Sequence, residues 1–240
     1  MKNFSIVLST VAVILAAVAL IMSSQKRPVS SSVEQVSAAL QENPQMVIDA
    51  LQKYQQEQRE AQEKAEAAAL AKYAGEINSA ENTAFVGPEN ASVTVVEFFD
   101  FSCGYCKRLA PSVEKAIADN ADVKFVFKPV SFVSSVSPYQ AKAGLAANKQ
   151  GKFLEFYKAV MAAQGRMTEA DVDAIAESLG LDMAKFKADL NSEEVSKSLA
   201  DIASLTSKIQ VNGVPTLFVN GKQVRAISVE QIQEAITAAK

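Results

Sequence analysis

The sequence contains no histidine, and its 240 residues include only two cysteines, Cys103 and Cys106. Without histidine, the chain cannot assemble the serine–histidine or cysteine–histidine pairs that activate catalytic nucleophiles. A structural zinc site needs four cysteine or histidine ligands, so a single chain cannot build the usual site. The nine glycines are scattered and form no phosphate-binding loop. We therefore expect neither a metal nor another cofactor.

An excess of basic charge is also absent. The formal net charge is -3 and the pI is about 5.2, so the composition does not suggest a surface for nucleic acid. Without its two ends the chain keeps roughly 160 residues, which is enough for one well-buried domain. The sequence thus indicates one globular domain that does not bind nucleic acid.

The two cysteines form the motif Cys103-Gly-Tyr-Cys106, between a β-branched and aromatic segment at 93–99 and a helical pattern at 107–118. A Cys-x-x-Cys pair without further ligands favours a redox dithiol. Cys103 would lie at the helix N-terminus, where unpaired N–H groups and the helix dipole stabilise a thiolate. Cys106, one turn further on, would be shielded and would act as the resolving thiol. The alternative is an inert buried pair or a static disulfide.

Two motifs carry a resemblance to a known family. The segment from Glu97 to Cys106, EFFDFSCGYC, resembles the active-site segment of DsbA-like, thioredoxin-fold disulfide oxidoreductases, and 211–221, VNGVPTLFVNG, is similar to their cis-proline loop and hairpin. Their order and their separation of roughly 110 residues make the match specific. The strand-to-helix crossover supports an α/β fold on its own. The resemblance implies a thioredoxin-like domain at 81–240 with a helical insertion at about 138–209.

Glu97 lies in the apolar strand that would run beneath the cysteines, and it matches the buried acid of the family. A buried carboxylate would have a raised pKa and could shuttle the proton of Cys106. The alternative is a partly exposed strand residue. Lys128, at the end of the next strand, is expected to approach Glu97. Lys107 and Arg108 either favour the thiolate or are solvated helix residues.

Pro215 matches the cis-proline of the family, although a cis X–Pro bond is a minority state in folded proteins and sequence alone would predict trans. The resemblance implies that Val214 offers backbone groups to an extended substrate strand beside Cys103. Gly104 and Tyr105, between the two cysteines, are expected to contact the substrate as well.

The direction of electron flow stays open. Gly104-Tyr105 is the dipeptide of the isomerase DsbC, whereas Val214 before the proline matches DsbA. An isomerase must act as a reduced dithiol, and we expect isomerase or reductase activity on unfolded or misoxidised proteins, with a membrane redox partner. The alternatives are a DsbA-like dithiol oxidase and a non-catalytic copper-handling or holdase module, since a dithiol can bind Cu(I).

Residues 1–27 are expected to be a targeting element, because Lys2 precedes an apolar run from Ser5 to Met22. The run is near the upper length of a signal peptide and the lower length of a membrane span. Both a cleaved signal peptide and an uncleaved anchor remain open. Either would place the dithiol in an oxidising compartment, the periplasm, with a possible tether to the inner membrane.

Residues 28–80 are expected to form a helical stalk with a short linker at Pro28–Ser32. Val33, Val36 and Leu40 have helical spacing, and a second helix follows Asn43-Pro44. The segment is rich in helix formers but poor in apolar area, so it would not be stable alone. The sequence LQENPQMVIDAL resembles the N-terminal region of ScsC proteins, which implies a homo-oligomer, with a trimer favoured. The alternative is an arm packed on its own domain.

Overall fold

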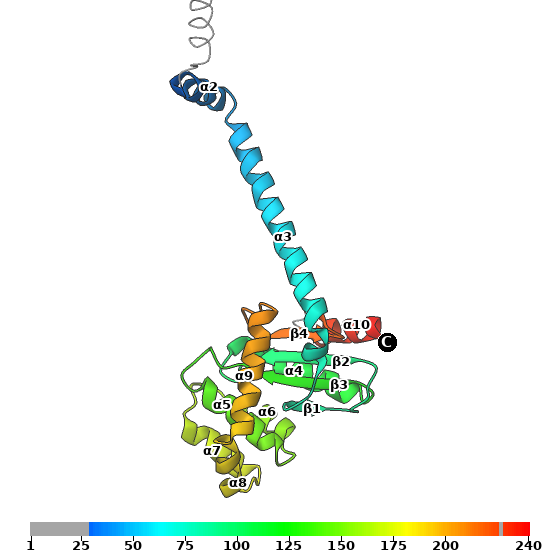
Figure 1. Ribbon diagram of the computed structural model, residues 1–240. Coiled ribbons are helices and arrows are strands. Elements are labelled where there is room, and N and C mark those ends of the chain that lie inside the picture. Colours follow the sequence, from blue (N-terminus) through cyan, green and yellow to red (C-terminus); the bar gives the residue numbers. More distant parts are fainter. Residues whose placement is uncertain (1–28, 226–227) are drawn as a thin grey trace, which may run out of the picture. The chain divides into compact units, whose positions relative to one another are not determined.

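The computed structural model describes residues 29–225 and 228–240 (Figure 1). The expected targeting segment at 1–27 lies outside these residues. In the described part of the chain, no helix is both long enough and apolar enough to cross a membrane. The chain divides into two compact units, residues 1–62 and 63–240, and the boundary falls inside one helix, α3.

A mixed sheet forms the centre of the unit at 63–240. Among the described residues, five strands pair in the order β1-β3-β2-β4-β5, with β2 and β3 parallel and the other pairs antiparallel. All six side chains of the central strand β2 are buried, because helices cover both faces of the sheet. The strands are β1 (Ala84–Val86), β2 (Thr94–Phe99), β3 (Lys124–Pro129), β4 (Thr216–Val219) and β5 (Lys222–Val224).

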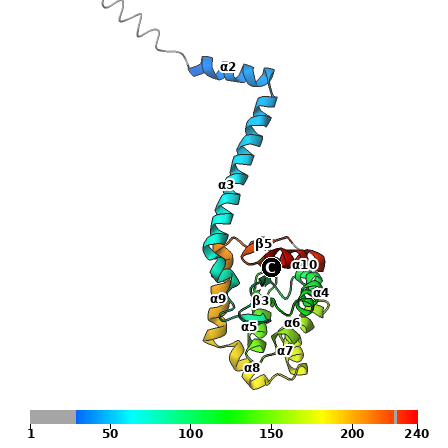
Figure 2. The ribbon, with the colours of Figure 1, turned by 90° about the vertical axis from the view of Figure 1, so that its right-hand side faces the viewer.

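The two faces of the sheet carry different clusters of apolar side chains. Val95 and Phe99 pack with helices α4 (Gly104–Asp119) and α10 (Val229–Ala239). Val96 and Phe98 face the opposite way, toward α9 (Glu193–Lys208) and the end of α3. Figure 2 shows α4 and α9 on opposite sides of the strands. Successive residues of a strand alternate between faces, so each strand residue belongs to one cluster only.

The predicted helical insertion is present between β3 and β4. A capping box of Thr168 and Asp171 begins the third helix of the insertion, and Ser192, whose side chain accepts a hydrogen bond from Val195 N, is the N-cap of α9. The insertion consists of α5 (Ser137–Asn148), α6 (Phe153–Ala162), α7 (Glu169–Ser178), α8 (Met183–Leu190) and α9. The α/β class with a DsbA-type insertion is therefore confirmed.

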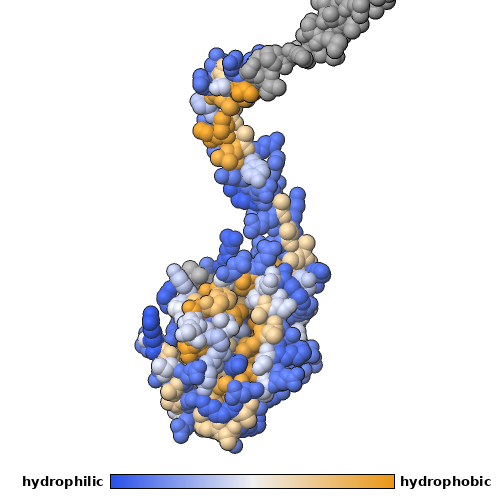
Figure 3. Space-filling view, turned by 60° about the vertical axis from the view of Figure 1, so that its left-hand side comes forward, coloured by the Kyte–Doolittle hydropathy of each residue, from blue (hydrophilic) through white to orange (hydrophobic). Residues whose placement is uncertain are grey.

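Two helices precede the sheet. Helix α2 spans Val29–Glu42 and α3 spans Gln45–Asn78, so residues 29–32 are helical and the linker predicted there is wrong. Among residues 33–62, the large apolar side chains are exposed to solvent, and part of them is visible in Figure 3. They are Val33, Val36, Leu40, Met46, Val47, Ile48, Leu51 and Tyr54.

The C-terminal part of α3, from Glu63 to Asn78, is different and belongs to the second unit. Ile77 is fully buried, and Leu70 and Tyr73 are partly buried against the cluster on the α9 face. The compact unit thus begins at Glu63 rather than after the helix.

Candidate active site

The dithiol lies at the start of α4, just after the loop that follows β2. Cys103 is the N-cap residue of α4, and its amide donates a 2.9 Å hydrogen bond to the carbonyl of Asp100. Both thiols are free; Cys103 is 6% exposed, and Cys106 is completely buried. Burial raises the pKa of the Cys106 thiol well above its usual range, and the neighbouring Glu97 and Cys103 add to this. The two sulfurs therefore stand in unequal environments, with Cys103 closer to solvent.

The loop before β4 meets Cys103, as the resemblance implied. The Val214–Pro215 peptide bond is cis, and the Cys103 thiol lies 3.5 Å from the Val214 carbonyl oxygen, to which it donates. Tyr105, in contrast, points outward and is 69% exposed. The guanidinium of Arg108 stacks on its ring, 4.2 Å from the centroid. The dithiol thus has the Val214 backbone within reach of Cys103 and an exposed aromatic side chain between its two cysteines.

Glu97 is a buried acid beneath the dithiol, not a partly exposed strand residue. Its side chain is 2% exposed, and Oε2 accepts a 3.0 Å hydrogen bond from the Tyr157 hydroxyl. The other oxygen, Oε1, is buried without a hydrogen-bond partner. Burial raises the pKa of Glu97 to about 8, although the Tyr157 hydrogen bond acts to lower it. An acid with this pKa can both accept and release a proton near neutral pH.

Tyr157 was not predicted from the sequence. It is fully buried on α6, 60 residues after Glu97, and its ring lies among Phe99, Phe127 and Phe153. The sequence shows only an apolar position on a helix, and such a position usually belongs to the core. The one available signal was the general rule that a buried tyrosine hydroxyl needs a hydrogen-bond partner, and this rule does not say which residue the partner is.

Two lysines considered from the sequence, Lys128 and Lys107, each donate a hydrogen bond to a backbone carbonyl. Lys128 is paired with Phe98 in the sheet register, so it lies on the opposite face from Glu97, and the expected approach is wrong. Its ammonium donates to the carbonyl of Ser79 at 2.9 Å. The Lys107 ammonium donates to the carbonyl of Ala163 at 2.7 Å. Desolvation lowers the pKa of Lys107.

A second buried carboxylate, Asp100, joins the two loops beside the dithiol. Its Oδ1 accepts hydrogen bonds from Ser102 N and the Ser137 hydroxyl, both at 2.8 Å. Its Oδ2 accepts from the amides of Phe132 and Val133, both at 3.1 Å. This role could not be predicted from the sequence, because Phe132, Val133 and Ser137 lie more than 30 residues downstream. Asp100 therefore fixes the turn that precedes Cys103.

Replacing Asp100 by asparagine should destabilise the domain by about 2 kcal/mol. The NH₂ group of the asparagine would face two hydrogen-bond donors, and the charge-assisted hydrogen bonds of the carboxylate would be lost. Equilibrium unfolding in urea would measure the change. Asp119→Asn is the matched control, because Asp119 forms only an exposed pair with Lys115 and should change stability little. Equal effects of the two substitutions would show that the four hydrogen bonds do not stabilise the turn.

A groove of about 500 Å³ opens beside the motif, lined in part by Ser102, Lys107 and Arg166. Phe132 and Val133, on the loop held by Asp100, are 56% and 44% exposed. Apolar side chains next to a hollow are typical of surfaces that bind other molecules. Within residues 29–225 and 228–240, no group of three or more His, Cys, Asp or Glu side chains is arranged to hold a metal ion.

Comparison with known proteins gives the same fold. A family model described as thioredoxin matches residues 79–238. The Na⁺/H⁺ antiporter NhaA 1 of Salinispora arenicola is 33% identical over 156 residues, which make up 64% of this chain but only 24% of that protein. The probable disulfide bond formation protein D of Bacillus anthracis is 30% identical over 149 residues, 57% of this chain and 69% of that protein.

Solved structures resemble a larger part of the chain. The crystal structure of BcfH from Salmonella enterica Typhimurium has a TM-score of 0.68 and 27% identity, covering 93% of this chain and 99% of that one. A linker-deletion mutant of Proteus mirabilis ScsC has a TM-score of 0.66 and 22% identity, covering 88% of this chain and 93% of that one. The ScsC likeness shows a shared fold.

Proposed function

Because the chain belongs to the thioredoxin family, we propose that it is a thiol:disulfide oxidoreductase acting outside the cytoplasm on protein disulfides. The arrangement of the dithiol carries this proposal. Cys103 caps a helix beside the cis Val214–Pro215 bond, and Cys106 lies buried beneath it. The buried acid Glu97 completes the arrangement on the same face of the sheet.

In the proposed reaction, the Cys103 thiolate attacks one sulfur of a substrate disulfide. The substrate S–S bond breaks, a mixed disulfide to Cys103 forms, and the other substrate sulfur leaves as a thiolate. In isomerisation, a substrate thiolate then attacks the mixed disulfide and releases Cys103 unchanged. In reduction, the Cys106 thiolate attacks Cys103, the second substrate thiolate leaves, and a Cys103–Cys106 disulfide remains. A membrane redox partner then returns that disulfide to the dithiol.

We assign the proton of Cys106 to Glu97. The buried Cys106 thiol must lose a proton before it can attack, and burial disfavours its charged form. The pKa of Glu97 is about 8, so its carboxylate becomes available as a base near the pH at which the enzyme must deprotonate a thiol. Tyr157 is a positioning residue, because its hydroxyl fixes Oε2 and leaves Oε1 without a protein partner.

Extended protein segments are the proposed substrates. The Val214 backbone beside Cys103 can pair with a strand of any sequence. Tyr105 and the exposed Phe132 and Val133 can contact apolar side chains that a folded protein would bury. These features favour unfolded or misoxidised proteins, in which apolar segments and disulfides are accessible together. Gly104, next to Cys103, leaves room for the substrate backbone.

We favour isomerase or reductase activity because the unit at 1–62 has the features of an oligomerisation stalk. Its exposed apolar side chains, such as Val36, Ile48 and Leu51, would be covered in a homo-oligomer, with a trimer favoured by the resemblance. Several dithiols in one assembly give a high effective concentration at a bound substrate. The second candidate is a dithiol oxidase, which is favoured by Val214 before Pro215 and by the relative described as a disulfide bond formation protein.

Removing residues 1–62 should give a folded monomer, because the compact unit begins at Glu63. Isomerisation of a scrambled multi-disulfide protein should fall about tenfold or more, since successive attacks lose the neighbouring dithiols. Reduction of a small disulfide should change less than about twofold, because one dithiol is sufficient for it. The parent for comparison lacks residues 1–27 and should sediment as a trimer.

A double variant, Ile48→Glu with Leu51→Glu, tests the same surface without a deletion. It should dissociate the oligomer, because two charges would be buried at the interface. Gln52→Glu is the matched control, since this exposed polar residue lies on the same helix, and it should remain an oligomer. A parent that sediments as a monomer would overturn the stalk, and a truncated monomer that isomerises as well as the parent would overturn its role in isomerisation.

A further inference from the structure

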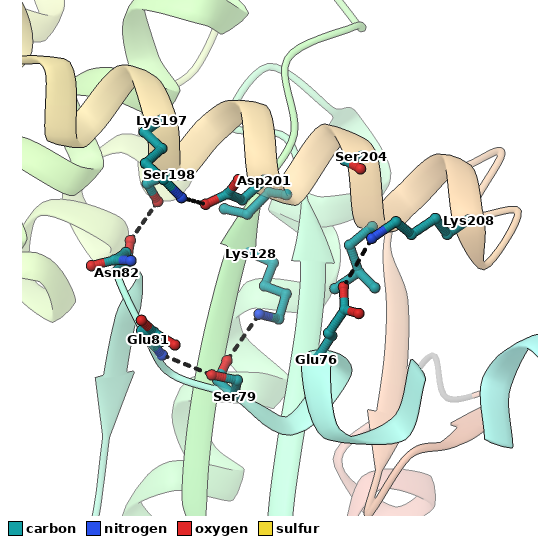
Figure 4. Close-up of a pocket in the computed structure, with 12 residues that line it drawn as sticks. Glu76, Ser79, Glu81, Asn82, Lys128, Lys197, Ser198, Asp201, Ser204 and Lys208 are labelled. Atoms are coloured by element: carbon teal, nitrogen blue, oxygen red, sulfur yellow. Dashed lines mark hydrogen bonds and ion pairs between the residues drawn. The ribbon is translucent and has the colours of Figure 1, made fainter. Parts of the chain in front are cut away.

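A second hollow lies on the α9 face of the sheet, away from the dithiol. It has a volume of about 250 Å³ and is bounded by α9, the end of α3 and the segment at 79–82 (Figure 4). Mostly polar and charged side chains line it. Because the sheet separates this hollow from Glu97 and Cys106, the proposed disulfide exchange does not use it.

The hollow has a buried lysine at its base. Lys128 is 4% exposed, and Figure 4 shows it on β3, reaching between α9 and the segment at 79–82. Its ammonium donates to the Ser79 carbonyl at 2.9 Å, and in the described part of the chain no carboxylate forms an ion pair with it. An ammonium has three donors, so two remain for water or a ligand. A buried charge is costly unless it is paired.

The other charged groups around the hollow largely compensate one another. Lys208 pairs with Glu76 at 3.2 Å, and Lys197 pairs with Asp201 at 2.6 Å. Glu81 adds a further carboxylate to the lining. In the described part of the chain, Lys128 is therefore the lysine of this lining without an ion pair, and Glu81 is the carboxylate without one. The Lys128 ammonium attracts one negative charge to the base of the hollow, and the Glu81 carboxylate repels a second negative charge further out.

We propose that this hollow binds a small monocarboxylic acid, whose carboxylate accepts hydrogen bonds from the Lys128 ammonium. The ligand neutralises the buried charge at the base of the hollow. The unpaired carboxylate of Glu81 repels dianions such as succinate and hydrogen phosphate, so these bind more weakly. The site is independent of the proposed redox activity, and it does not require Cys103 or Cys106.

Binding should weaken as the pH rises, because the lysine must be protonated to hold the carboxylate. Burial lowers the pKa of Lys128 to about 8, and the nearby Glu76 carboxylate acts against this shift. A bound carboxylate raises the pKa further, so the affinity should fall above about pH 8. The charged groups that face the lysine are Glu76 on α3, Glu81 in the segment before β1, and Lys197, Asp201 and Lys208 on α9.

A titration of the protein lacking residues 1–27 with sodium acetate tests the proposal, with sodium chloride at equal ionic strength as the reference. We expect saturable changes in the ¹H–¹⁵N NMR signals of Ser79 and Ser204, both of which line the hollow. Lys128→Met should abolish saturation, and the exposed Lys158→Met should leave it unchanged. Glu81→Gln should reduce the preference for acetate over succinate.

Two results would overturn the proposal. One is a linear response to acetate that matches chloride, which would leave Lys128 as an anchor for the segment at 79–82. The other is saturation that survives in Lys128→Met. If that variant does not fold, the parent still decides the question, because its acetate affinity must fall at least tenfold between pH 7 and pH 10. A pH-independent affinity is incompatible with a ligand held by Lys128.

Discussion

Replacing Cys106 by alanine should leave the protein joined to its substrates through a stable mixed disulfide at Cys103. Cys103 caps α4 and lies closer to solvent, so it attacks first. Without Cys106, no internal thiol can release the substrate. Reduction of a protein disulfide should fall on the order of 10³-fold, because only external thiols then resolve the intermediate. Non-reducing electrophoresis with mass spectrometry would identify the trapped adducts.

Cys103→Ala is the control, and it should neither trap substrates nor reduce them. Cys106 lies in the first turn of α4 and is completely buried, and burial raises the pKa of its thiol, so it is a poor first nucleophile. If Cys103→Ala trapped substrates and Cys106→Ala did not, the roles of the two cysteines would be reversed. If neither variant lost activity, the dithiol would not be the reactive group.

The dithiol could be predicted because its signals are local. Two cysteines one helical turn apart, a β-branched strand before them and an apolar helical face after them are all contained in residues 93–118. The cis bond before Pro215 was predicted from the resemblance rather than from the residues, since a trans bond is the ordinary state. The helical insertion was likewise predicted from the resemblance.

The parts of the site that were not predicted depend on distant contacts. Tyr157 reaches Glu97 from an insertion helix 60 residues away, and Asp100 bonds amides 32 and 33 residues downstream. The position of Lys128 was predicted on the wrong face, because a shift of one residue in a strand moves a side chain to the other side of the sheet. A sequence pattern shows that side chains alternate between the two faces of a strand, but the pairing with the neighbouring strand determines which residues lie side by side on one face.

Replacing Glu97 by glutamine should stabilise the reduced protein at neutral pH and not at pH 4. The pKa of Glu97 is raised from 4.5 to about 8 in the folded state, so the folded form keeps a proton that the unfolded form loses. The stability of the parent therefore falls as the pH rises from about 4.5 to 8. Glutamine mimics the protonated acid and avoids this loss. The gain should be about 3 kcal/mol at pH 7, measured by urea unfolding at each pH.

The same substitution should slow the release of the mixed disulfide. Glutamine cannot take the Cys106 proton, so resolution should fall roughly 100-fold near neutral pH, while the first attack by Cys103 stays nearly unchanged. In the parent, the resolution rate should rise with pH and level off above about 8, where Glu97 is ionised. Stopped-flow measurement of substrate release would separate the two steps.

Tyr157→Phe provides the matched test of how Glu97 is tuned. Loss of the hydroxyl removes a hydrogen bond that lowers the pKa of Glu97, so the pH at which resolution levels off should move upward. A purely structural tyrosine would change stability without moving that pH. If Glu97→Gln matched the parent in both resolution rate and pH-dependent stability, Glu97 would be a neutral part of the core. The Cys106 proton would then have to leave through solvent, although Cys106 is completely buried.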